Sequence, residues 1–247
     1  MISIKARAAV LAALLLVAPA LAGPLVVRAI GPSAPGFKPG ARLPDNAPLV
    51  LKAGDQVTIL DARGTRSFSG PGSFRFESVS ASAAPTGFTE LLTQKPERRA
   101  RIGAVRGSGG TATGTPVPPG VWAVDAGRTG TVCALDPAKI SLWRANPTAA
   151  GNVTITRVSG ASSPAASATT SVLPFAPGQA VANWPAALPV ADGDQFRTTG
   201  AGAPATLTIR KLVAPAAIDA LGAALLASGC QSQFDRLTTV TKVTDAP

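Results

Sequence analysis

Short runs of alternating apolar and polar residues, separated by Gly, Pro, Asn and Asp, recur along most of this 247-residue chain. The clearest run lies within residues 49–76, where Val57 and Ile59 would share one face of a strand and Gln56 and Thr58 the other. Alternation with a period of two, broken by turn residues, is typical of short antiparallel strands. The pattern therefore predicts a mainly β protein.

The first predicted β-domain covers residues 24–80. Its strands are expected at 24–30, 49–51 and 56–60, and the turn at 61–64 then reverses the chain. Three phenylalanines supply the inward positions that follow, at Phe68, Phe74 and Phe76. The Pro- and Gly-rich residues 33–46 are expected to form a loop.

A second predicted domain, sandwich-like or barrel-like, covers residues 120–240. Within it Val153, Ile155 and Arg157 would share one face of a strand. Many short strands at turn-separated spacing are typical of an antiparallel sandwich or barrel. Strands are expected at residues 121–126, 131–136, 139–145, 152–158, 170–175, 179–184, 195–200 and 205–212.

One C-terminal α-helix is expected after Pro215, and residues 241–247 are expected to form a loose tail. Apolar residues recur at helical spacing from Ile218 to Leu237. This stripe favours a helix that packs on the sheet of the second domain. The alternative is a membrane-surface helix, which the lack of cationic residues before Arg236 disfavours.

Residues 81–119 are rich in Ser, Ala, Gly, Thr and Pro and read as a linker, with a short helix at 87–94. A basic cluster lies within this linker. One interpretation is a solvated linker, and the other is contact with an anionic lipid or polysaccharide surface. A nucleic acid partner is disfavoured because stacking aromatic residues are missing nearby. The cluster consists of Lys95, Arg98, Arg99, Arg101 and Arg106.

Residues 1–22 have the three parts of a secretory signal peptide. Lys5 and Arg7 precede the apolar run 8–17, and a small-x-small site at 20–22 predicts cleavage before Gly23. A permanent membrane anchor is the alternative, but the apolar run is shorter than the roughly 20 residues of a spanning helix. We therefore expect a periplasmic or secreted protein with no stable membrane span after cleavage.

The chain contains two cysteines, Cys133 and Cys230. Export to an oxidising compartment favours a disulfide between them, and two buried free thiols are the alternative. A redox-active pair is disfavoured because the chain has no C-x-x-C motif.

Residues 43–74, LPDNAPLVLKAGDQVTILDARGTRSFSGPGSF, resemble the strand–turn rhythm of FecR-type periplasmic domains. Gly54-Asp55 and Asp61 to Gly64 occupy the matching turns. The resemblance implies a small periplasmic β-module with a sensing or scaffold role. Family members that act in iron signalling carry a cytoplasmic segment and a membrane helix before this domain, whereas this chain has a predicted cleavable signal.

The side chains that most enzymes use for proton transfer are scarce in this sequence. Histidine is absent, which excludes Ser–His–Asp and Cys–His catalysis and removes the commonest metal ligand. Asp192 and Asp194 could be offered as paired carboxylates, but an Asp-Gly-Asp stretch is more often a turn. We therefore predict no catalytic residues, no metal and no cofactor.

These features together predict an exported, non-enzymatic β-protein that senses, scaffolds or binds an envelope protein partner. The alternative is a basic envelope-surface or glycan-binding protein, which the formal net charge of +10 also suits. That protein would bind through the basic cluster or through the tryptophans Trp122, Trp143 and Trp184. The other interpretation of the tryptophans is that they fill the hydrophobic core.

Overall fold

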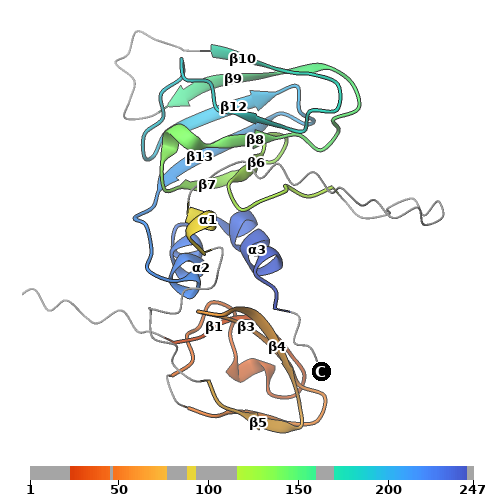
Figure 1. Ribbon diagram of the computed structural model, residues 1–247, viewed down its shortest axis with the longest axis vertical. Helices are drawn as coiled ribbons and strands as arrows, with labels where there is room; N and C mark the ends of the chain where they lie inside the picture. Colours follow the sequence, from red (N-terminus) through yellow and green to blue (C-terminus); the bar gives the residue numbers. More distant parts are fainter. Residues whose placement is uncertain (1–22, 45–46, 77–87, 93–115, 160–169, 244–247) are drawn as a thin grey trace, which may run out of the picture.

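The computed structural model describes residues 23–44, 47–76, 88–92, 116–159 and 170–243. Short strands dominate, so the predicted mainly β fold class is confirmed, although the sheets do not close into a barrel. Figure 1 shows three tiers along the long axis: an N-terminal β unit, a layer of helices and a C-terminal β unit. The predicted signal peptide and the basic cluster lie outside the described residues.

The N-terminal unit contains two small antiparallel sheets. One has the order β1-β3-β4, formed by β1 (Leu25–Ile30), β3 (Gln56–Asp61) and β4 (Gly64–Ser69). The other pairs β2 (Leu49–Leu51) with β5 (Gly72–Phe74). The loop predicted between the first two strands includes a short 3-10 helix, η1 (Ala34–Gly36).

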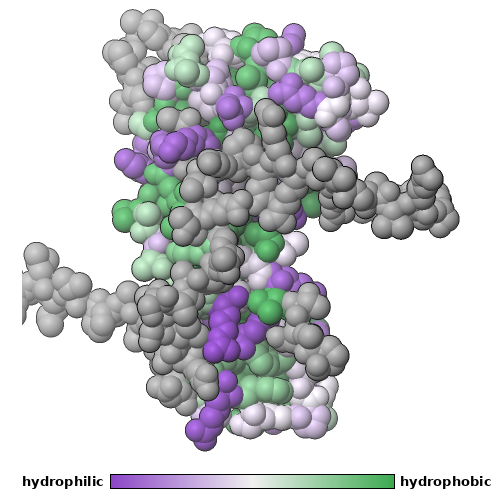
Figure 2. Space-filling model, in the orientation of Figure 1, coloured by the Kyte–Doolittle hydropathy of each residue, from purple (hydrophilic) through white to green (hydrophobic). Residues whose placement is uncertain are grey.

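The core of this unit follows the predicted alternation. Val57 and Ile59 are buried, and Phe76 joins them. Phe68 is half-buried, with its ring centroid 4.9 Å from that of Phe74 and 5.4 Å from that of Phe76. In the view of Figure 2, polar and apolar residues are interspersed over the surface of both β units.

Asp55 fixes the turn that leads into β3. Its carboxylate accepts the backbone N–H of Ser33 at 2.8 Å and that of Lys52 at 2.6 Å. The backbone hydrogen bond from Ser33 is the main cause that holds the pKa of Asp55 below its ordinary value, and burial of the carboxylate opposes it. This carboxylate joins the loop after β1 to the β2–β3 turn.

The C-terminal unit packs a five-stranded sheet against a three-stranded sheet. The larger sheet has the order β10-β9-β12-β13-β7, and β13 and β7 run parallel. The smaller sheet has the order β11-β8-β6, and β6 and β8 run parallel. The expected strands are present, but these two parallel pairs make both sheets mixed. Their bounds are β6 (Ala123–Asp125), β7 (Gly130–Ala134), β8 (Ser141–Trp143), β9 (Gly151–Ser159), β10 (Thr170–Phe175), β11 (Val181–Asn183), β12 (Gln195–Thr199) and β13 (Ala205–Lys211).

The core of this unit lies between its two sheets. Val153 and Ile155 of β9 are buried there, as their shared face predicts. Arg157 shares that face, and its guanidinium forms a 2.6 Å ion pair with Asp194 and stacks over the Phe196 ring. A buried charge is tolerated when it is paired and hydrogen-bonded, so Asp194 explains the cation in this core.

The helical layer contains α1 (Phe88–Leu92), α2 (Ile218–Ala227) and α3 (Gln231–Val240). The predicted single C-terminal helix is thus two helices, and Gly229 separates them with a left-handed φ of 76°. The apolar stripe is buried as expected, at Leu221 and Leu225 of α2 and Leu237 of α3. No helix among the described residues has the length and apolar character that crossing a membrane requires.

These helices do not pack only on the C-terminal unit. α2 contacts β1 and β3, whereas α3 contacts β7 and β4. Leu25 and Leu60 of the N-terminal unit therefore share one apolar cluster with Leu221 and Leu225. Gly222 makes this packing possible, because a Cβ there would overlap the Leu60 side chain.

The segment after α3 is held by the N-terminal unit, contrary to the expected loose tail. The N–H of Thr65 in β4 donates to the Thr241 carbonyl, and the N–H of Val243 donates to the Thr65 carbonyl, both at 2.9 Å. Gly64, with a φ of 123°, allows this approach because a Cβ would collide with the Thr241 carbonyl. Residues 244–247 lie outside the described residues.

Candidate functional site

A groove of about 240 Å³ lies between β7 and α3, where the C-terminal unit meets the helical layer. Its deepest residues are apolar and come from both sheets of the C-terminal unit. Val124 of β6, Val132 of β7 and Leu207 of β13 are all buried, and Val121 precedes β6. The groove therefore opens onto one edge of the hydrophobic core of the C-terminal unit.

The walls of the groove are polar. α3 contributes Ser232, Asp235, Arg236 and Thr239, and the turn between β6 and β7 contributes Arg128. An apolar floor with a few polar groups around it is the usual character of a binding site.

The charged side chains on these walls differ in whether they already form hydrogen bonds within the protein. An Asp125 carboxylate oxygen accepts the Gly127 N–H at 2.9 Å, and an Asp235 carboxylate oxygen accepts from the Gln231 amide at 2.8 Å. A guanidinium nitrogen of Arg236 donates to the Pro119 carbonyl at 2.9 Å. Arg128 is exposed, and within the described part of the chain its guanidinium has no hydrogen bond or ion pair.

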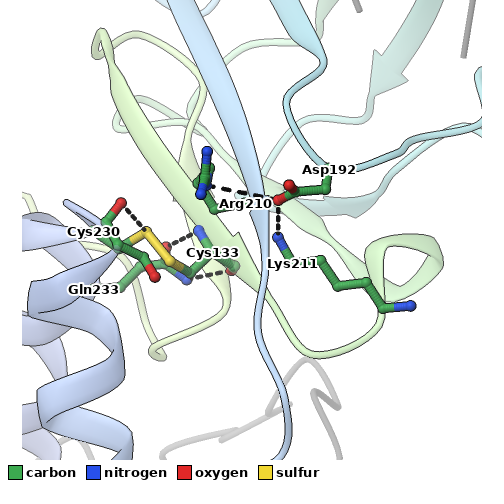
Figure 3. Close-up of a disulfide and its surroundings, with 7 residues drawn as sticks. Cys133, Asp192, Arg210, Lys211, Cys230 and Gln233 are labelled. Atoms are coloured by element: carbon green, nitrogen blue, oxygen red, sulfur yellow. Dashed lines mark hydrogen bonds and ion pairs between the residues drawn. A yellow bond between two sulfur atoms is a disulfide. The ribbon is translucent and has the colours of Figure 1, made fainter. Parts of the chain in front are cut away.

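The predicted disulfide between Cys133 and Cys230 is present, and each cysteine is near a residue that lines the groove, Val132 on β7 and Ser232 on α3. It joins β7 to the residue that precedes α3, across a sequence separation of 97 residues. Figure 3 shows the Gln233 side chain beside this bond, facing the backbone of Cys133. The Gln233 carboxamide accepts the Cys133 N–H at 2.6 Å and donates to the Cys133 carbonyl at 2.8 Å.

Gln233, Arg128 and Thr131 were not identified from the sequence as candidate site residues. For Gln233, the sequence does contain one indication. Gln233 lies within the helical stripe formed by Cys230, Phe234 and Leu237, which is a buried face. A polar residue on such a face needs a hydrogen-bond partner, and the backbone of an outer strand can provide one.

The Asp192–Asp194 stretch serves a turn, as its Asp-Gly-Asp pattern predicts. Asp194 is fully buried against Arg157, and its carboxylate also accepts the Ala191 N–H. Asp192 accepts the Lys211 N–H at 2.8 Å (Figure 3). Among the described residues, no group of three or more potential ligands could hold a metal ion.

The three tryptophans fill cores. Trp122, Trp143 and Trp184 are all buried, and the Trp184 ring packs edge-on against Phe196 at 4.8 Å. The indole N–H groups of Trp122 and Trp184 donate to the carbonyls of Leu91 and Leu188. A carbohydrate-stacking platform needs exposed rings, so the tryptophans do not form one.

Comparison with known proteins adds no assignment: no protein-family model, no curated protein and no solved structure matches this chain.

Proposed function

We propose that this chain is an exported, non-enzymatic β-protein that binds a partner protein in the cell envelope through the groove between β7 and α3. The observation that carries this proposal is the groove itself, which has an apolar floor, polar walls and a strand at its edge. Such a combination suits a protein segment, because side chains can enter the floor while polar groups meet the walls.

Features of the sequence support the same function. The predicted signal peptide at residues 1–22 favours export, and the FecR-like rhythm of residues 43–74 favours a sensing or scaffold role. The chain has no histidine, which is the commonest general base in enzymes. The disulfide suits an oxidising compartment.

The proposal is tested by affinity capture from an envelope extract of the source cell, with quantitative mass spectrometry. Two baits are compared with the unaltered protein. Val117→Glu places a charge on the groove rim, where Val117 is 60% exposed, and Val172→Glu places the same charge on β10, where Val172 is 55% exposed. We expect a partner that the Val117→Glu bait loses and the Val172→Glu bait retains.

Two results would count against this function. One is that the unaltered protein captures no partner reproducibly. The other is that the two variants lose the partner equally, which would place the contact outside the groove.

A further inference from the structure

The strand beside the groove has a backbone position, Thr131, whose polar groups pair with no neighbouring strand or side chain within the described residues. β7 is an outer strand of its sheet, with β13 as its only neighbour among the described strands. The Ala134 carbonyl accepts the Leu212 N–H at 2.9 Å, so the backbone polar groups of Ala134 face β13. Successive residues of a strand direct these groups to opposite sides. Those of Cys133 and Thr131 therefore face away from β13, toward the open edge.

The open edge is already paired at Cys133 by a group that resembles a peptide bond. The Gln233 side chain is a carboxamide, with one carbonyl acceptor and an N–H donor, and it satisfies both backbone groups of Cys133. Thr131 lies two residues earlier on the same edge and lines the groove. The next pairing position is thus about 6.6 Å along the strand, at a rise of about 3.3 Å per residue.

We propose that an extended segment of the partner protein binds as an added strand along β7 at Thr131, with an aliphatic side chain on the groove floor and an acidic residue at Arg128. This inference rests on the proposed function and specifies its binding mode. Addition of a strand to an open sheet edge gives affinity through main-chain hydrogen bonds, and adjacent pockets give specificity.

The size and lining of the groove favour an aliphatic side chain of the partner segment. Val121, Val124, Val132 and Leu207 present hydrocarbon to it. Its volume of about 240 Å³ exceeds the roughly 150 Å³ that accommodates a benzene molecule. It is smaller than the roughly 300–1,000 Å³ of typical small-molecule sites. A side chain of a peptide therefore fits this floor better than a whole cofactor.

The positive charge of Arg128 favours an acidic residue in the partner segment. Asp125 and Asp235 each already accept a hydrogen bond from a neighbouring residue, whereas Arg128 is exposed at the rim and has no partner within the described residues. A carboxylate on the partner would meet the Arg128 guanidinium. The excess of Lys and Arg over Asp and Glu, which remains after removal of the predicted signal peptide, would also steer an acidic segment toward this protein.

The test uses random linear peptides displayed on phage, selected against the purified protein. Selected sequences are synthesised and their affinities measured by calorimetry. We expect a shared aliphatic residue flanked by Asp or Glu. Methylation of one backbone nitrogen of the peptide at a time removes single main-chain donors without changing the protein, and we expect at least one position to weaken binding by about tenfold or more.

Two pairs of protein variants locate the contact. Thr131→Pro removes only an N–H that faces away from β13, a position where proline is tolerated in a strand, and Thr131→Val keeps that N–H. We expect Thr131→Pro to weaken peptide binding by about tenfold and Thr131→Val to have little effect. Arg128→Ala should weaken acidic peptides, whereas Arg197→Ala, on exposed Arg197 of β12, should not.

The outcomes separate the binding mode from the proposed function. Peptides that tolerate methylation at every backbone nitrogen, or a folded Thr131→Pro variant with unchanged affinity, would overturn the added strand but leave partner binding in place. The same holds if no peptide is selected while an envelope partner still depends on Val117. Dimerisation that Thr131→Pro abolishes would assign the edge to a second copy of this chain and overturn the proposal.

Discussion

Replacing Gln233 with methionine tests whether the carboxamide supports the junction between α3 and β7. Methionine has a similar length but cannot donate to the Cys133 carbonyl, and it is a poor acceptor for the Cys133 N–H. Both backbone groups belong to a residue that is 1% exposed, and Gln233 itself is 6% exposed. A buried polar group that loses its partner costs about 1–3 kcal/mol. Two such groups, with some relaxation, should lower the free energy of unfolding by about 2–4 kcal/mol.

The measurement is guanidinium denaturation under non-reducing conditions, with the disulfide verified by thiol titration. Gln231→Met is the matched control, because Gln231 is exposed at the start of the same helix and its amide bonds only to Asp235 in the described structure. The control should change the free energy of unfolding by less than about 0.5 kcal/mol. Equal stability of the Gln233→Met variant and the unaltered protein would refute the argument that this carboxamide pairs a buried strand edge.

Three further predictions are also tested by chemical denaturation. Replacing Cys133 and Cys230 with alanine should lower the free energy of unfolding by about 4–5 kcal/mol, because the bond closes a loop with a sequence separation of 97 residues. Gly222→Val should cost about 1–3 kcal/mol, because its side chain would overlap Leu60. The lowered folded pKa of Asp55 means that its carboxylate stabilises the fold at pH values above its ordinary pKa of 3.8. This contribution should disappear as the pH falls through the folded pKa, and Asp55→Asn should remove it from a urea series between about pH 2 and 7.

The strands could be predicted because local alternation determines them. Each strand between 121 and 212 falls on an expected alternating segment, and the inward residues Ile155, Leu207 and Ile209 are buried as their register requires. Alternation does not reveal which strands become neighbours. The parallel pairing of β13 with β7 joins segments about 75 residues apart, and it depends on the packing of the whole unit.

The arrangement of the helices was only partly predictable. The stripe from Ile218 to Leu237 identified the buried face, but a stripe does not name the surface that covers it. Leu25 and Leu60 cover part of it, and they come from a unit about 160–210 residues earlier in the chain. The stripe also continues across Gly229, whose left-handed backbone divides the segment into two helices.

The groove could not be predicted, because it forms where several distant segments meet. Val121, Thr131, Leu207 and Arg236 belong to four different parts of the chain, and no local pattern connects them. The disulfide was the one long-range contact that the sequence provided, since two cysteines allow a single pairing. It joins β7 to the start of α3, the two elements beside the groove, without indicating the groove itself.

Three of the described sheet edges are guarded in ways that differ from the edge of β7. An outer strand with free backbone groups tends to pair with other chains, and proteins limit this by covering or interrupting such edges. Here β1 is bridged by Arg42, β4 by residues 241–243, and β10 contains Pro174, which has no N–H. On β7, Gln233 covers Cys133 but leaves Thr131 open above an apolar floor. One residue with unpaired backbone groups is too few for a strand of any sequence to add stably to this edge. It is enough to align a segment that also places a side chain on the groove floor.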